Sequence, residues 1–126
     1  MTTPVTVGVV GLGYWGPNLA RNFDRLPGAA LRWICDGSEQ ARERWAPQFP
    51  GTRVSGDLAE LLEDPELDAV VVATDVPSHA AVATRVLEAG KHCFVEKPLA
   101  QSVAEAEQVV AAAKESGRTL MVGHLL

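Results

Sequence analysis

Short apolar runs alternate along this chain with segments in which apolar residues recur every three or four positions. The apolar runs predict strands at residues 5–10, 31–36, 53–55, 68–73, 91–95 and 119–122. The segments with helical spacing predict helices at residues 15–26, 38–49, 58–62 and 78–88, and from about residue 102 to Gly117. Such alternation is typical of one parallel sheet with helices on both faces.

Several helix details follow from the same pattern. Leu19, Phe23 and Leu26 fall on one face of the first helix, and Pro17 fits only its first turn. Ser38, Asp57 and Ser78 stand where side chains cap helix N-termini. In the last helix, the stripe predicted to face the sheet consists of Val103, Ala106, Val109, Val110 and Ala113.

A glycine-rich loop joins the first strand to the first helix. Its glycine spacing suits a dinucleotide pyrophosphate: the first glycine allows a tight turn, the second a close approach of phosphate, and the third close packing of helix on strand. The helix N-terminus then faces the anion. We therefore predict cofactor binding by Gly11, Leu12, Gly13, Tyr14, Trp15 and Gly16.

An acidic residue ends the second predicted strand. Asp36 stands at the distance from the glycine loop where a carboxylate would accept hydrogen bonds from the adenosine ribose. Alternatively, it only begins the turn before the next helix. A carboxylate repels a 2′-phosphate and favours NAD, whereas Ser38, which we also place at the cofactor, and Arg42 leave NADP open.

Six strands with a glycine loop after the first fit a Rossmann-type, doubly wound sheet of order 3-2-1-4-5-6, in a three-layer α/β/α single domain. Ligands bind such sheets at the carboxyl ends of the strands. The loops there contain the candidate residues Thr74, His79, Glu96, Lys97, Pro98 and His124.

Each of these loop residues also has a plainer interpretation. Thr74 could be a turn residue, and His79 is, on its own, better interpreted as a surface histidine near a helix cap. Lys97 could lie in a solvated turn or assist proton transfer beside a nicotinamide. Pro98 restricts it to extended geometry and is compatible with a cis bond. His124 either lines the site or begins a linker.

Composition excludes several classes of function. The 126 residues suffice for one domain, and a formal net charge of -5 without a basic run argues against nucleic-acid binding. No apolar stretch is long enough to span a bilayer and no signal peptide precedes the first strand, so we expect a soluble, cytoplasmic protein. Cys35 and Cys93 fit reduced core thiols, and their spacing predicts no metal site.

The glycine loop, the segment from Ala73 to His79, and Glu96-Lys97-Pro98 together resemble the N-terminal NAD(P)-binding domain of the Gfo/Idh/MocA oxidoreductases, along essentially the whole chain. The phrase from Gly13 to Phe23 looks most like the branch of nucleotide-sugar 3-dehydrogenases and 3-ketoreductases. The resemblance implies hydride transfer between a nicotinamide cofactor and a sugar or nucleotide-sugar hydroxyl or keto group. It also implies that Lys97 is catalytic and that Thr74 and His79 belong to the cofactor loop.

The chain also departs from the family pattern. Asp75 stands where the family often has proline, and His124 where an aromatic residue is frequent. The substrate domain of relatives is absent from residues 1–126, so we expect a fragment or truncated product that is inactive alone. Surface left bare by that domain would favour homo-oligomers. A stand-alone nucleotide-binding or redox-sensing module, or a structural remnant without cofactor affinity, are the alternatives.

Overall fold

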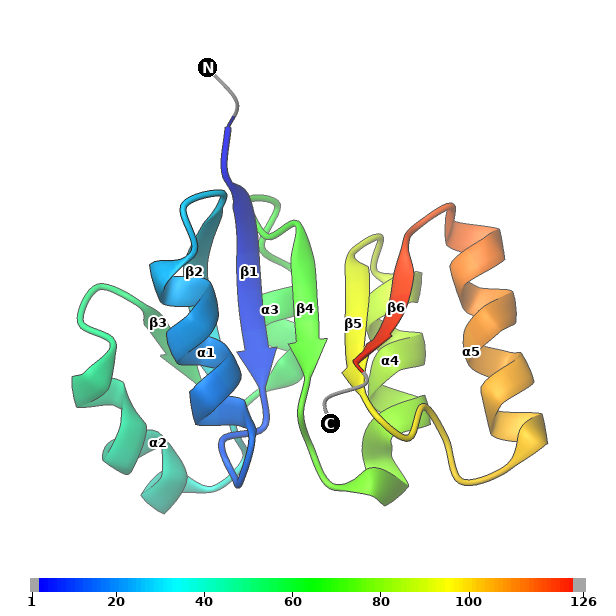
Figure 1. Ribbon diagram of the computed structural model, residues 1–126, viewed down its shortest axis with the longest axis horizontal. Helices are drawn as coiled ribbons and strands as arrows, with labels where there is room; N and C mark the ends of the chain where they lie inside the picture. Colours follow the sequence, from blue (N-terminus) through cyan, green and yellow to red (C-terminus); the bar gives the residue numbers. More distant parts are fainter. Residues whose placement is uncertain (1–2, 124–126) are drawn as a thin grey trace.

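The computed structural model describes residues 3–123 as a six-stranded parallel sheet of order β3-β2-β1-β4-β5-β6 (Figure 1). The strands are β1 (Val5–Val10), β2 (Ala29–Cys35), β3 (Arg53–Ser55), β4 (Ala69–Val72), β5 (His92–Glu96) and β6 (Leu120–Gly123). The helices are α1 (Gly16–Arg25), α2 (Glu39–Trp45), α3 (Leu58–Leu62), α4 (His79–Glu88) and α5 (Val103–Ser116), with short 3-10 turns η1 (Ala46–Gln48) and η2 (Val76–Ser78). The predicted doubly wound Rossmann sheet and its strand order are confirmed.

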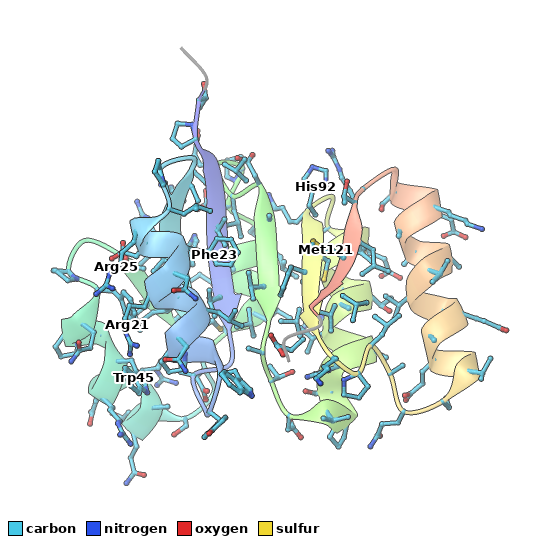
Figure 2. The ribbon with its side chains drawn as sticks, in the orientation of Figure 1. Arg21, Phe23, Arg25, Trp45, His92 and Met121 are labelled. Carbon is cyan, nitrogen blue, oxygen red and sulfur yellow. The ribbon has the colours of Figure 1, made fainter. Side chains whose placement is uncertain are left out.

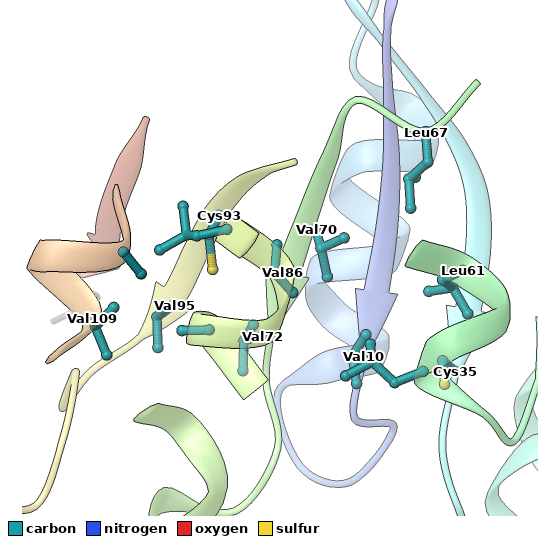
Figure 3. Close-up of a cluster of buried hydrophobic side chains, with 14 of the residues drawn as sticks. Val10, Cys35, Leu61, Leu67, Val70, Val72, Val86, Cys93, Val95 and Val109 are labelled. Carbon is teal, nitrogen blue, oxygen red and sulfur yellow. The ribbon is translucent and has the colours of Figure 1, made fainter. Parts of the chain in front are cut away.

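Two apolar clusters hold the three layers together. On the face of the sheet seen in Figure 1, α1 buries Leu19 and Ala20 against β1 and β2. On the opposite face, α3, α4 and α5 bury a larger cluster that includes Leu61, Val86 and Val109 (Figure 3). Because the central strands β1 and β4 are covered from both sides, they have the continuous apolar sequences typical of buried parallel strands.

The sheet is less covered at β5 and β6. Met121 points away from α5 and is 59% exposed (Figure 2). Phe94 beside it is only partly buried. Within residues 3–123, no helix lies over this part of the sheet (Figure 1). A bare apolar strand face of this kind is the surface on which a further element or domain can pack.

At the amino ends of the strands, polar groups bond to one another. The Asp64 carboxylate accepts hydrogen bonds from the Arg32 guanidinium and, at 2.7 Å, from Trp33 Nε1. The Arg32 bond is the main reason that the pKa of Asp64 lies well below its usual range. Lys91 Nζ donates to the Asp64 carbonyl oxygen at 2.7 Å. This network joins β2 to the segments that precede β4 and β5.

Two predictions about helix extent were wrong. The helix expected over residues 38–49 ends at Trp45, because Pro47 lies in the first turn of a separate 3-10 turn. Leu26 follows α1 with an extended backbone and is exposed, so it does not continue the apolar face of that helix.

The predicted stripe on α5 was also partly wrong. Val109 and Ala112 are its buried residues, whereas Val103 and Val110 are exposed. The apolar residues of α5 cover more than one side of the helix, so their spacing alone could not fix which side meets α4 and the sheet. Gly117 ends the helix in the left-handed conformation, at φ +67°.

Candidate functional site

The glycine loop closes tightly on the end of β4. Gly11 has φ +101°, and a Cβ atom there would lie 2.5 Å from the Ala73 carbonyl. A Cβ at Gly16 would lie 1.6 Å from the Gly11 carbonyl oxygen. By contrast, a Cβ at Gly13 would meet nothing within 4 Å. Gly11 and Gly16 are therefore required by the fold itself, whereas Gly13 leaves open space toward a cleft.

Asp36 ties this loop to the next one. Its Oδ2 accepts from the Leu12 N–H at 2.7 Å, and its Oδ1 accepts from the Ser38 N–H at 2.8 Å. The second bond is the turn interaction that the plainer interpretation expected, whereas ribose binding by Asp36 stays a prediction. The carboxylate is therefore fixed in place, and each oxygen retains a lone pair for a further donor.

The five helices differ in how their N-termini are capped. Ser38, Asp57 and Ser102 cap α2, α3 and α5 through their side chains, and each of these helices has a glutamate in its first turn. The two other helices, α1 and α4, have neither a side-chain cap nor an acidic residue there. Both of them begin beside the cleft, so their positive ends remain available to an anion.

The segment between β4 and α4 is held by its own hydroxyl groups. Ser78 Oγ lies 2.7 Å from Thr74 Oγ1 and 2.9 Å from Asp75 Oδ1. Ser78 therefore braces the loop, and the prediction that its side chain caps the helix was wrong. The Asp75 carboxylate therefore accepts a hydrogen bond from within its own loop.

His79 is buried, with an exposed fraction of 2%, so its interpretation as a surface histidine was wrong. Its Nδ1 lies 2.7 Å from the Pro98 carbonyl oxygen, and its Nε2 lies 2.8 Å from that of Thr74. The ring therefore bridges the loop after β4 and the turn after β5. Sequence reasoning placed His79 in the right loop but missed this bridge.

At the end of β5, Glu96 and Lys97 have opposite environments. Glu96 is the last residue of the strand and is buried, and within residues 3–123 its Oε1 has no hydrogen-bond partner. Lys97 is exposed, and the Lys97–Pro98 bond is cis, which the sequence permitted. A buried carboxylate oxygen without a partner is costly, and a ligand with hydroxyl or amide donors would relieve that cost.

A cleft of about 890 Å³ unites most of the predicted residues. The predicted residues that line it are Gly11, Gly13, Tyr14, Trp15, Asp36, Thr74, His79, Glu96 and Lys97. Leu12 and Ser38 instead line a neighbouring groove beside Tyr14. Gly16 and Pro98 line neither of the two, and His124 lies outside the described residues.

Val82 and Arg85 also line the cleft, and we did not predict them. They follow His79 at steps of three residues along α4, which was the signal that could have revealed them. Cys35 lies at the inner wall, where burial raises the pKa of its thiol to about 11. This thiol is therefore a core group and a poor nucleophile.

The described part of the chain has neither a candidate metal site nor a candidate membrane-spanning helix. Residues 3–123 contain no group of three or more metal-ligating side chains. Nor does any helix within them have the length and apolar character needed to cross a membrane. The expectation of buried, reduced cysteines is confirmed for Cys35 and Cys93, which are free.

Comparison with known proteins agrees with this geometry. Residues 5–124 match the model of an oxidoreductase family with an NAD-binding Rossmann fold. The chain is 35% identical to scyllo-inositol 2-dehydrogenase (NAD(+)) of Bacillus subtilis over 126 residues, which cover 99% of this chain and 37% of the relative.

Two solved structures illustrate the range of relatives. GenD2 from gentamicin A biosynthesis, in complex with NAD, superposes with a TM-score of 0.91 at 39% identity, over 98% of this chain and 35% of that one. KijD10, a 3-ketoreductase from Actinomadura kijaniata in complex with TDP-benzene and NADP, gives 0.86 at 32% identity, over 95% and 38%. The chain spans about a third of the length of the curated relatives that it matches.

Proposed function

Because this chain belongs to the Gfo/Idh/MocA oxidoreductase family and contains its NAD-binding Rossmann domain, we propose that its cleft binds a nicotinamide dinucleotide. The observation that carries the proposal is the glycine loop. Gly11 and Gly16 are fixed by packing, while the space above Gly13 is open and faces the uncapped N-terminus of α1. A pyrophosphate suits that space, because unpaired N–H groups and the helix dipole favour an anion.

We assign the two ends of the dinucleotide from the positions of the acidic side chains. Asp36, held by two backbone N–H groups, accepts from the adenosine ribose hydroxyls and disfavours a 2′-phosphate, so NAD is preferred over NADP. Thr74 and Glu96 lie on the other side of the glycine loop, at the nicotinamide end of the cleft. The unpartnered Glu96 Oε1 is the acceptor that a ribose hydroxyl there would satisfy.

The proposed reaction is hydride transfer between the cofactor and a sugar or nucleotide-sugar carbon. The cofactor, when bound, supplies the acceptor or donor of the hydride. Lys97 carries the accompanying proton: its neutral amine takes the hydroxyl proton during oxidation, and its ammonium returns one to the alkoxide during reduction. The exposed lysine stands at the rim of the cleft, where it can meet a substrate.

The substrate class rests on the relatives and on the glycine-loop phrase. A 3-ketoreductase that binds TDP-benzene and an inositol dehydrogenase both align with nearly all of this chain. The cleft formed by residues 3–123 has room for the cofactor but few groups that would select one sugar. We therefore propose that this chain alone binds cofactor without turnover, and that a second domain, packed on the bare face near Met121, supplies the sugar site.

Isothermal titration with NAD+ and NADP+ tests the cofactor assignment. We expect saturable binding of NAD+, weaker binding of NADP+, and loss of both in Gly13→Val, whose side chain would occupy the pyrophosphate position. Gly28→Val is the matched control, because a Cβ there also meets nothing within 4 Å and Gly28 lies before β2, outside the residues that line the cleft. Failure of the wild-type chain to bind either cofactor at about millimolar concentration would refute the proposal.

A further inference from the structure

The two histidines that the structure describes have opposite hydrogen-bond partners. His79 presents both ring nitrogens to carbonyl oxygens, those of Pro98 at 2.7 Å and Thr74 at 2.8 Å. His92, at the amino end of β5, accepts at Nδ1 from the Thr119 N–H at 3.0 Å. A carbonyl oxygen can only accept, whereas an N–H can only donate. The two rings therefore need different numbers of protons.

A neutral imidazole cannot satisfy both partners of His79. It carries one N–H and one lone pair, so one carbonyl oxygen would face a nitrogen lone pair at hydrogen-bond distance. With only 2% of the residue exposed, a water molecule has little access to separate the two. A doubly protonated ring has two N–H groups and satisfies both carbonyl oxygens with charge-assisted bonds. His92, conversely, needs its Nδ1 lone pair.

We propose that His79 is an imidazolium in the folded chain and acts as a positioning residue that ties the loop after β4 to the turn after β5. The buried imidazolium of His79 thereby holds the backbone of Thr74 and of Pro98, which follows Lys97. This consequence for Lys97 rests on the function proposed above, whereas the protonation state of the ring does not. His79 then acts through the loops that it holds rather than by contact with substrate.

The cleft that His79 lines contains more acidic than basic side chains, which favours a cation there. The buried Glu96 lines the same cleft with one oxygen unpartnered, and Asp75 lies in the loop that precedes α4. Arg85 on α4 and Lys97 oppose them from exposed positions at the cleft. Strand β4 contributes only alanine and valine. Among the described residues that line the cleft, there are four carboxylates (Asp36, Asp57, Asp75 and Glu96) and two cations (Arg85 and Lys97).

Long-range ¹H–¹⁵N spectra of the histidine rings test the protonation state directly. Each of the three histidines is assigned by its loss in a His→Gln variant. At about pH 8, where an imidazole in water is mostly neutral, we expect His79 to show two equivalent protonated nitrogens and His92 to show the neutral Nε2–H form. A neutral pattern for His79 at that pH would overturn the proposal, whether or not the chain binds cofactor.

Titration of NAD+ separates positioning from mere packing. His79→Gln keeps hydrogen-bond donors at only one end, so we expect about tenfold weaker binding, with the fold retained by circular dichroism. His92→Gln, the matched control at the other end of the sheet, should leave affinity unchanged. Equal affinity in His79→Gln and the wild type would overturn the positioning role. If His79→Gln fails to fold, the ring spectrum of the wild-type chain still decides the proposal.

Discussion

The two ends of this sheet use their polar groups differently. At the amino ends of the strands, Asp64, Arg32 and Trp33 satisfy one another, and Asp68 Oδ2 accepts from the Thr6 N–H at 2.9 Å. At the carboxyl ends, Glu96 Oε1 has no partner among the residues that the structure describes, and α1 and α4 begin without side-chain caps. The polar groups at the first end stabilise the fold, whereas at the second end Glu96 Oε1 and the N-termini of α1 and α4 remain available to a ligand.

The same comparison applies to single residue types. His92 at the amino end accepts one backbone N–H, whereas His79 at the carboxyl end bridges two carbonyl oxygens. Lys91 is buried and donates to Asp64, whereas Lys97 is exposed at the cleft. The same residue type therefore has different partners at the two ends of the sheet.

The largest expected effect is a difference in the free energy of unfolding between variants of two glycines in the same loop. Gly16→Ala would place a Cβ 1.6 Å from the Gly11 carbonyl oxygen, so we expect the free energy of unfolding to fall by roughly 3 kcal/mol. Gly13→Ala, with open space around its Cβ, should change it by less than about 0.5 kcal/mol while weakening NAD+ binding. Urea denaturation measures both, and equal destabilisation would contradict the distinction.

Next in size is the effect of Lys97 on turnover. In a chimaera that joins this chain to the remaining part of a family relative, Lys97→Ala should lower kcat by about 10²-fold or more with little change in cofactor affinity, because proton transfer is lost. Steady-state kinetics with the relative's substrate provides the measurement. Lys114→Ala, on the exposed side of α5, should leave kcat unchanged. Full turnover without Lys97 would remove its catalytic role.

Asp64 tests the amino end as a structural region. Asp64→Asn should lower the free energy of unfolding by roughly 2 kcal/mol, because Arg32 and Trp33 would then donate to a neutral amide instead of a charged carboxylate. The folded-state pKa of this carboxyl is lowered, so its contribution is present above the unfolded value of about 3.9 and is lost as the pH falls below it.

Thermal unfolding across the acidic range measures this contribution, with the exposed Asp24→Asn as the control. Wild type and Asp64→Asn should converge in stability at low pH. If Asp64→Asn instead weakened NAD+ binding without loss of stability, the separation of the two ends would fail.

The smallest expected effect concerns cofactor preference. Asp36→Ser removes the carboxylate that disfavours a 2′-phosphate, so the ratio of NAD+ to NADP+ affinities should fall by about tenfold. It also removes the acceptor of the Leu12 N–H, so NAD+ affinity should decrease as well. Competition titrations measure the ratio. An unchanged ratio would mean that Asp36 serves only the glycine loop and the turn at Ser38.

Much of this fold was predictable because its signals are local. Strand β1, the glycine loop and Asp36 follow each other within one βαβ unit, and their spacing reflects one ligand geometry. The exposed side of α5 was not predictable, because alanine and valine occur on several of its sides and only α4 decides which side is buried. Side-chain periodicity alone does not identify the neighbouring element.

The sequence predicted which loops form the candidate site, but it did not predict the contacts between their side chains and backbones. Thr74, His79, Glu96 and Lys97 follow strands whose carboxyl ends meet, and the structure brings them to one cleft. The bridge between His79 and the Pro98 carbonyl oxygen joins residues nineteen positions apart, and its strength depends on burial that only the folded chain creates. Such non-local hydrogen bonds leave no periodic signal in the sequence.

The most direct measurement of the central claim is the change in backbone amide chemical shifts when NAD+ is added to ¹⁵N-labelled protein. We expect the largest changes at the carboxyl end of the sheet, in residues 11–16, at Asp36 and Thr74, and at Glu96 and Lys97. The amides of Asp64, Asp68 and His92 should change little. Shifts concentrated at the amino end, or no saturable shifts at all, would contradict the account.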